Sequence, residues 1–334
     1  MGHPKPSDGG GRASLRDAVG VRSILALVIC LTAALLLLSD GGAGKGGDQA
    51  TVEQIRCQLQ TADGESAVYT VTQTGDADLR LLVTVDGDRP IDLLFSVFID
   101  GRQVAVSWDG GRSSTLTATL QPDTVKEIAV RVQDLPRGTH CAHILSTAIP
   151  AVDGKLTRDY LMSSATTIML HPFTVVSQGQ IEPSQHDQEG RVSLTALTDR
   201  LAGAGQAGVL SVSPDYLRLS PAFDIRDRQE LWFIWANRDS APTEVEFVLL
   251  VDWLQAEWPG RQSSLLAAVV DHGDAVVQSI DLSQLPLSEA SFIAVLSFQW
   301  PTRPFWLLDD SGHAYVDRDG GQAHGSNLVV VLGH

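Results

Sequence analysis

The sequence predicts an all-β protein with two tandem antiparallel β-sandwiches after an N-terminal transmembrane or signal segment. Three observations support this prediction. Short runs of alternating apolar and polar residues, separated by Asp-Gly turns, dominate the chain after residue 50. Four short strings recur about 150 positions apart, and one uncharged apolar run lies near the N-terminus. Alternation with a period of two is typical of half-buried strands, and short strands with regular turns are typical of sandwiches.

The apolar run Ile24–Leu38 has 15 residues and no charge. As a helix it would span about 22 Å, which is less than the roughly 30 Å of a bilayer's hydrocarbon core. A membrane anchor over residues 23–39, a cleaved signal peptide and a buried helix all remain compatible with this length. Cys30 follows Ile29, where a lipidation signal would have Gly or Ala, so we predict no lipid anchor.

The charges around this run predict its orientation. Residues 1–22 form a basic tail with a net charge of +2, which leaves −18 for the rest of a chain whose total is −16. A positive flank stays inside the cell, so we expect a single-pass cell-membrane protein with its C-terminal region outside the cytoplasm. Cleavage of the segment would instead give a secreted protein. In the anchored form the chain contacts the lipid bilayer through Ile24–Leu38, and the Gly-rich residues 40–50 form a flexible tether.

The strand-like runs of the first half occur at regular spacing. They cover 67–74, 79–85, 93–99, 103–108, 115–120 and 127–132, and 166–170 closes the set. Turn signals such as Asp100-Gly101 and Asp109-Gly110 separate them, because Asp and Gly tolerate the backbone angles of tight turns.

A repeat links the two halves of the chain. The strings Leu81-x-Val83-x-Val85 and Phe95-x-Val97-x-Ile99-Asp100 return as Leu231-x-Phe233-x-Trp235 and Phe247-x-Leu249-x-Val251-Asp252, at offsets of 150 and 152. Leu135-Pro136 and Ile144-Leu145-Ser146 return as Leu285-Pro286 and Val295-Leu296-Ser297. Four strings in one order indicate two copies of one β-domain. We place the first sandwich at 51–172, a linker with a short helix over 191–201 at 173–208, and the second sandwich at 209–334, closed by a strand over 327–332.

The string from Phe95 to Gly101, together with Asp134–His140, resembles bacterial immunoglobulin-like surface domains of the cell-adhesion-related type. The resemblance covers most of 66–150 and, more loosely, 230–301. The second copy lacks both the Asp-Gly turn and the Gly-x-His corner. The resemblance implies a fold and a location at the cell surface, and it implies no catalytic residue.

Several functions are not expected from this composition. A pI near 4.8 argues against nucleic acid, which requires clustered Lys and Arg. No H-E-x-x-H, zinc-spaced Cys/His cluster or G-x-S-x-G is present, so we predict no enzyme, metal or cofactor. The G-x-G-x-x-G letters of Gly203–Gly208 lack the strand and helix that a nucleotide site needs.

Acidic turns leave a weaker alternative, because Asp317-Arg318-Asp319-Gly320 and Asp86-Gly87-Asp88 offer oxygen ligands for calcium. Asp and Gly are also what turns need for backbone reasons, and this explanation is preferred.

Cys57 and Cys141 follow the apolar run and would lie in an oxidising compartment, so a disulfide between them is the first expectation, with two buried thiols as the alternative. Six of the seven Trp residues fall in the second half. Trp258, Trp300 and Trp306 stand near loop signals and are candidates for ligand contact, with core packing as the alternative.

The leading functional hypothesis is a non-enzymatic, envelope-anchored protein whose two immunoglobulin-like domains serve adhesion, scaffolding or binding to an envelope protein. A carbohydrate-binding surface module that uses the exposed Trp residues is the first alternative. An unrecognised secreted hydrolase is the second.

Overall fold

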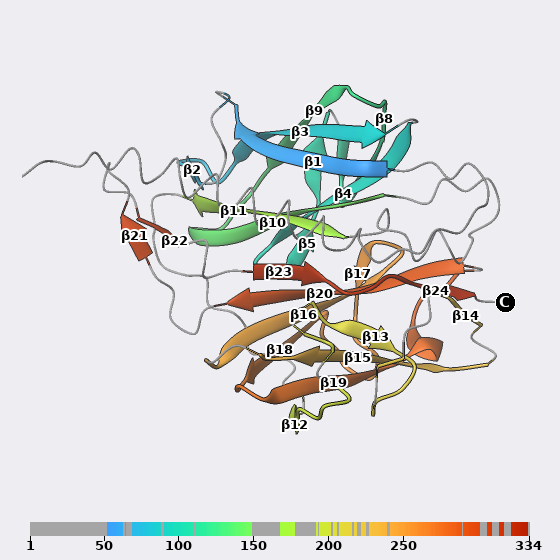
Figure 1. The fold of residues 1–334 in the computed structure, drawn as a ribbon. Coiled ribbons are helices and arrows are strands. Elements are labelled where there is room, and N and C mark those ends of the chain that lie inside the picture. Colours follow the sequence, from blue (N-terminus) through green and yellow to red (C-terminus); the bar gives the residue numbers. More distant parts are fainter. Residues whose placement is uncertain are drawn as a thin grey trace, which may run out of the picture. The chain divides into compact units, whose positions relative to one another are not determined.

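The computed structural model of the chain is built almost entirely of β-strands in the part that it describes (Figure 1). The described residues are 52–62, 64, 69–87, 90–109, 111–148, 168–177, 192, 194–201, 203–205, 207–215, 217–218, 222–224, 227–238, 241–288, 290–300, 306–308, 314–316 and 322–332. Within these ranges the single helical element is the 3-10 turn η2, Leu282–Gln284. The predicted all-β class is therefore confirmed. Residues 50–334 contact one another closely enough to form one compact unit.

Two sheets enclose the first core. One has the order β1 (Val52–Thr61), β3 (Ala77–Gly87), β9 (Val125–Val132), β6 (Val106–Trp108) and β7 (Gly111–Ser113). The other has the order β2 (Tyr69–Thr72), β11 (Met169–Ser177), β10 (Gly138–Ala148), β4 (Ile91–Ile99) and β5 (Arg102–Val104), with β8 (Thr115–Leu120) also on β4. All pairs are antiparallel except β2 with β11. We call this sheet pair the first sandwich.

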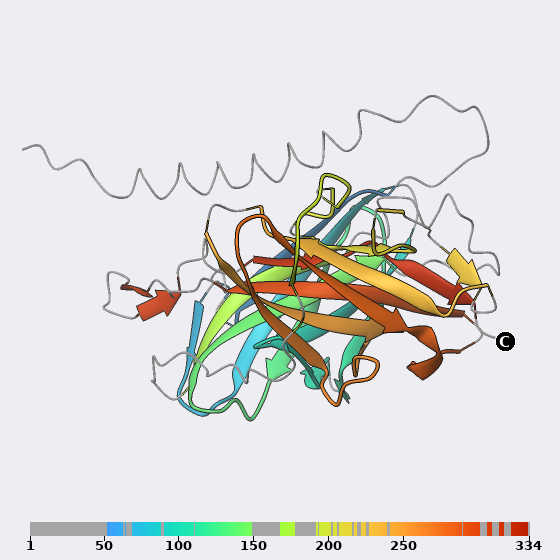
Figure 2. The same cartoon turned by 90° about the horizontal axis from the view of Figure 1, so that it is seen from below.

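Two further sheets enclose the second core. One has the order β12 (Leu194–Ala196), β19 (Asp274–Asp281), β15 (Glu230–Ala236) and β13 (Val209–Ser211). The other has the order β14 (Ala222–Asp224), β24 (Val329–Leu332), β20 (Ala290–Trp300), β16 (Thr243–Val251) and β17 (Leu254–Ala256); β18 (Leu265–Val270) joins β16, and β23 (Gln322–Gly325) joins β20. A separate pair comprises β21 (Trp306–Leu308) and β22 (Ala314–Val316). Figure 2 shows these strands from below. This sheet pair is the second sandwich.

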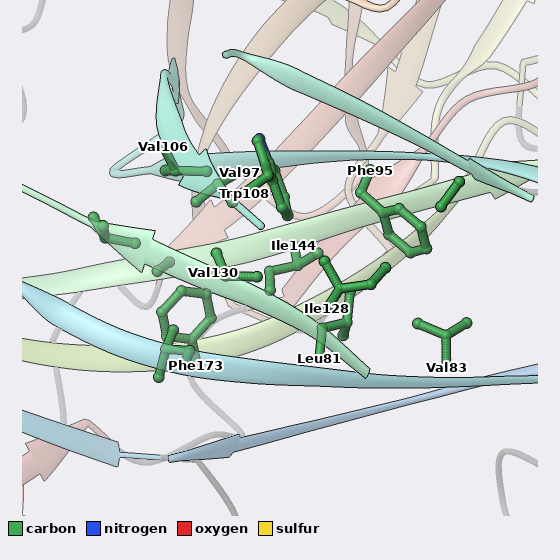
Figure 3. Packing of buried hydrophobic residues seen from close by; sticks show 14 of the residues in the cluster. Leu81, Val83, Phe95, Val97, Val106, Trp108, Ile128, Val130, Ile144 and Phe173 are labelled. Carbon is green, nitrogen blue, oxygen red and sulfur yellow. The ribbon is translucent and has the colours of Figure 1, made fainter. Parts of the chain in front are cut away.

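The first core forms because alternation sends every second side chain inward. Leu81 and Val83 of β3 meet Ile128 and Val130 of β9, and all four side chains are buried. Figure 3 shows them facing Phe95 of the opposite sheet. Full burial of one such side chain stabilises the fold by about 1.5–3 kcal/mol relative to exposure.

The second core uses larger rings at the equivalent positions. Phe233 and Trp235 of β15 both contact Phe247 of β16, at ring-centroid distances of 5.0 and 5.8 Å and near-perpendicular angles. Edge-to-face pairs of this kind are favourable for aromatic rings. Trp235, which the repeat matches with the inward-facing Val85, is a core residue with none of its surface exposed.

The strand order is that of immunoglobulin-like domains. The sheet β1-β3-β9-β6 and the sheet β11-β10-β4 match the two sheets of that fold, with a first strand divided between β1 and β2. In the second sandwich β14-β24-β20-β16-β17 repeats β2-β11-β10-β4-β5, and β14 with β24 is again the parallel pair. The fold-level resemblance predicted from the sequence therefore holds.

The predicted linker needs a correction, because two of its segments are strands. β11 continues to Ser177, beyond the predicted boundary at 172, since its backbone pairs with β10 as far as Gly138. Leu194–Ala196, expected to be helical, is β12 and pairs with β19. β12 takes the place beside β19 that β6 takes beside β9, so this part of the linker completes a sheet.

The aspartates of the Asp-Gly turns at 100 and 109, and of the Pro122-Asp123 turn, are explained by backbone geometry. Asp100, Asp109 and Asp123 all have a positive φ, between 32° and 54°. Asp is among the few non-glycine residues that adopt this region readily. Asp86 forms an ion pair with Arg56, and the residues described here hold no group of three or more metal-ligating side chains. Asp88 and the Asp317–Gly320 string lie outside the described residues.

No helix among the described residues is long and apolar enough to cross a membrane. The predicted anchor Ile24–Leu38, its basic tail and the Gly-rich tether all lie outside those residues.

Candidate functional site

The two sandwiches pack against each other through a third apolar cluster, which we call the junction. Its side chains come from β4 and β10 of the first sandwich and from β16 and β20 of the second. Phe98 and Phe298 meet at its centre with their ring centroids 5.7 Å apart. Strands that are buried on both faces are almost continuously apolar, and the run from Leu93 to Ile99 follows this pattern with Ser96 as its single polar residue.

Two glutamines related by the repeat close one side of the junction. The Gln103 N–H donates to Gln255 Oε1 at 2.7 Å, and the Gln255 N–H donates to Gln103 Oε1 at 2.8 Å. The two residues are 152 positions apart, which is the offset between Phe95 and Phe247. Strands β5 and β17 thus meet through matched positions, as in the self-complementary interface of a two-fold dimer.

An aspartate at the end of each central strand fixes the neighbouring strand. The Asp100 N–H donates to the Cys141 carbonyl at 2.8 Å, and Asp100 Oδ1 accepts the Cys141 N–H at 3.0 Å. Asp252 makes the same two bonds with Phe292, each at 2.9 Å. These aspartates end the matching strings found in the sequence, so the repeat extends to individual hydrogen bonds.

The second oxygen of each aspartate has a different partner in each copy. Asp100 Oδ2 lies 2.7 Å from His140 Nδ1, whereas Asp252 Oδ2 accepts a hydrogen bond from the Ser291 hydroxyl at 2.9 Å. His140 Nε2 lies 3.0 Å from the Pro136 carbonyl, so both ring nitrogens face acceptors. Burial lowers the pKa of His140, but the hydrogen bond and charge of Asp100 outweigh it, and the pKa is raised overall.

A pocket of about 390 Å³ opens at the edge of the junction beside this pair. Ile99, Val104 and Leu265 give it apolar walls, while Asp100, Arg102, His140 and Glu246 contribute charged or polar groups. Acid–base catalysis by His140 would need one ring nitrogen available to a substrate or nucleophile. Asp100 and the Pro136 carbonyl occupy both ring nitrogens of His140. The contact between His140 and Asp100 therefore holds a corner of the fold in place and is poorly arranged for catalysis.

His140 and His143 lie on opposite faces of β10, as their spacing predicts. His143 faces the junction, where its ring centroid lies 5.1 Å from that of Phe298. Burial lowers the pKa of His143 to about 4, and the charge of Asp100 offsets only part of this effect. His171, which is hydrogen-bonded to Ser146, also has its pKa lowered to about 4 by burial.

The predicted disulfide between Cys57 and Cys141 is wrong, because both residues are free thiols. Cys57 packs against the core of the first sandwich, where its Sγ lies 3.7 Å from Ser146 Oγ. Cys141 points into the junction from the other face of the sheet that contains Ser146. A whole sheet therefore separates the two sulfurs, and the alternative of two separate thiols holds, each of them partly buried.

The three candidate Trp residues do not form one exposed surface in the structure. Trp258 is buried, with 1% of its surface exposed, and its indole N–H donates to the Phe247 carbonyl at 3.3 Å. Its predicted ligand contact is therefore corrected to core packing. The Trp300 and Trp306 backbones lie in β20 and β21, and their side chains are outside the described set.

Alternation continued from Phe247 would place Trp253 in the core of the second sandwich, but Trp253 is buried in the junction. Asp252 and Trp253 both have a positive φ, of 50° and 69°, which breaks the alternation that the prediction extended from Phe247. Its ring stacks on Phe292 at 5.8 Å.

Sequence reasoning missed the glutamine pair and one partly exposed tryptophan. Extending the repeat alignment past Asp252 would have matched Gln103 with Gln255. Trp232 lies between the inward-facing Leu231 and Phe233, so alternation alone places it on the outer face of its sheet.

No family model and no curated protein matches this chain. Among solved structures, the chain is similar to the CARDB domain of the PF1109 protein from Pyrococcus furiosus, with 11% identity, a TM-score of 0.25, and coverage of 40% of this chain and 99% of that one. It is also similar to the Escherichia coli chaperone DraB, with 10% identity, a TM-score of 0.25, and coverage of 81% and 95%. Similarity at these scores carries no argument about activity or partners.

A side chain at Gly101 would require the buried Glu246 carboxylate to shift, which predicts a selective effect of alanine. A Cβ there would lie 2.8 Å from Glu246 Oε2, whereas a Cβ at Gly260 would meet nothing within 4 Å. The two glycines have nearly the same φ, 71° and 72°, so Gly→Ala adds similar backbone strain of about 1 kcal/mol at each. We expect Gly101→Ala to lower the free energy of unfolding by a further 1–3 kcal/mol or so. Urea titration of both variants checks this, and equal losses would contradict it.

Acid should weaken the first sandwich through His143. Its native pKa of about 4 lies below the unfolded value near 6.5, so the unfolded state binds the extra proton and stability falls as pH drops between these values. The repeat matches His143 with Ala294. We expect His143→Ala to reduce the change in the free energy of unfolding with pH by up to about 1.4 kcal/mol per pH unit. Urea titrations at pH 4.5 to 7 measure it.

His140→Ser is the control for this experiment, because it copies Ser291. The pKa of His140 is raised in the folded protein, so its contribution to stability is lost only as pH rises above the unfolded value near 6.5. This variant should therefore keep the dependence of stability on pH between pH 4.5 and 6. An unchanged slope in His143→Ala would contradict the assignment to His143.

Neither of these two partly buried thiols should react in the folded protein. Burial raises the pKa of Cys57 to about 11 and that of Cys141 to about 12, which removes the thiolate that reacts. In a Cys30→Ser variant we expect no labelling by Ellman's reagent at pH 8, and two equivalents after addition of guanidinium chloride. Fast labelling of the folded protein, or none after denaturation without reductant, would contradict this.

Proposed function

We propose that this chain is a non-enzymatic, envelope-anchored protein that binds another protein through two immunoglobulin-like domains held in one rigid unit. The observation that carries the proposal is the junction. An apolar cluster and a reciprocal glutamine pair join the two sandwiches, so they present a fixed surface and not two independently moving ones.

The electrostatics of the outer faces support a binding role for this unit. On the outer face of β3 and β9, Arg80 pairs with Glu127, and Arg131 pairs with Asp76 and Asp78. Exposed pairs of this kind contribute little to stability, but arranged charges give specificity in protein association. The occupied nitrogens of His140 count against the alternative of a hydrolase at the junction pocket.

The location is part of the proposal. Ile24–Leu38 would cross the membrane with the basic tail in the cytoplasm, and the acidic remainder would lie outside. A net charge of −18 beyond the run would keep the domains away from anionic lipid.

Cross-linking in cells tests the proposal. The full chain with a C-terminal tag is cross-linked, purified and analysed by mass spectrometry, beside Gly101→Ala, which disturbs the junction, and Gly260→Ala, its control. We expect the same envelope protein to be recovered with wild type and Gly260→Ala, and at least about fivefold less of it with Gly101→Ala. Repeated recovery of no envelope protein by the wild-type chain would contradict the proposal.

A further inference from the structure

The outer face of the sheet β12-β19-β15-β13 is divided into two different halves. Ile234 and Ala236 are covered by Leu201 and Ala204 of the preceding segment. Trp232, two positions earlier on the same face, is only partly buried and lines an open pocket of about 540 Å³. Sites for small ligands have volumes of about 300–1,000 Å³.

The pocket surrounds this indole with polar side chains. Besides Trp232 it is lined by Val212, Asp227, Arg228, Gln229, Glu230 and Asp281. Arg228 Nη1 donates to the Val212 carbonyl at 3.0 Å, which holds the guanidinium at the edge of the pocket. Asp281 accepts hydrogen bonds from Ser283 and Gln284 and caps η2, so its carboxylate serves the fold.

From this arrangement we propose that the pocket at Trp232 binds a neutral oligosaccharide. The apolar C–H face of a pyranose ring can stack on the partly exposed indole of Trp232, which offers a rigid apolar surface. Each sugar hydroxyl both donates and accepts, and the rim supplies donors from Arg228 and Gln229 beside acceptors from Asp227 and Glu230. This site differs from the Trp residues that the sequence suggested, because Trp258 is buried.

Two other ligand classes fit the pocket less well. Nucleic acid would meet three carboxylates against one guanidinium on an acidic chain. A basic peptide would find carboxylates and an aromatic face, but the fixed cation of Arg228 stands at the same rim. A ligand without net charge that uses donors and acceptors together is the best match.

Isothermal titration calorimetry on the full chain, in a detergent without sugar groups, tests the site. The probes are the hexasaccharides of β-1,4-glucose, α-1,4-glucose and β-1,4-N-acetylglucosamine. We expect at least one to bind with a Kd below about 1 mM and Trp232→Ala to weaken it about tenfold or more. The control is Leu82→Ala, which removes the repeat-related side chain of β3 and should leave the Kd unchanged.

A second variant keeps the test decisive if Trp232→Ala unfolds. Glu230 is exposed, so Glu230→Gln should keep the fold and still weaken sugar binding by about threefold or more. The proposal is overturned if none of the three probes binds, or if binding is unchanged in both pocket variants. It is also overturned if hexalysine binds in a Trp232-dependent way and the sugars do not.

Discussion

The apolar residues on both faces of the central strands determine how this protein is organised. β4 and β16 each bury seven consecutive residues, so one face fills a sandwich core and the other must find a second apolar surface. Each copy provides that surface for the other, which removes Phe98, Leu250 and Phe298 from water together. Without the junction, each sandwich would expose a large apolar sheet face, which marks an interaction site or an aggregation hazard.

Polar groups give this apolar contact a fixed register. Apolar packing is non-directional, whereas the reciprocal bonds of Gln103 and Gln255 are satisfied in one alignment of β5 and β17 only. Close packing of Gly101 against Glu246 and Leu265 restricts the same region sterically. Trp253 occupies the matching turn of the second copy with a positive φ, an uncommon conformation for a bulky residue that its burial in the junction helps to offset.

The sequence predicted the all-β class, the immunoglobulin-like resemblance and the turn aspartates, because these follow from alternation and local backbone preference. It located the matching strings of both copies, which occupy equivalent strands down to Asp100 and Asp252. The wrong predictions for individual side chains have a common cause. Alternation tells which face a side chain takes, but not whether that face meets a core, another sandwich or water. Cys141, expected to form a disulfide within the first sandwich, and Trp253, which alternation places in the core of the second, therefore both lie at the junction.

The same distinction explains where ligand contact could arise on this fold. A tryptophan at an inward-facing strand position, such as Trp235, is buried in the core. A tryptophan in a loop can also be buried there, as Trp258 is. Trp232 is only partly buried because its side chain points to the outer face of its sheet. The covering segment shields Ile234 and its neighbours but leaves Trp232 at an open pocket. Burial of the sheets β4-β10 and β16-β20 in the junction leaves the opposite sheets to meet solvent. Among the residues that the structure describes, an outward-facing ring on one of those sheets, such as that of Trp232, is thus an aromatic side chain that the architecture leaves accessible to a ligand.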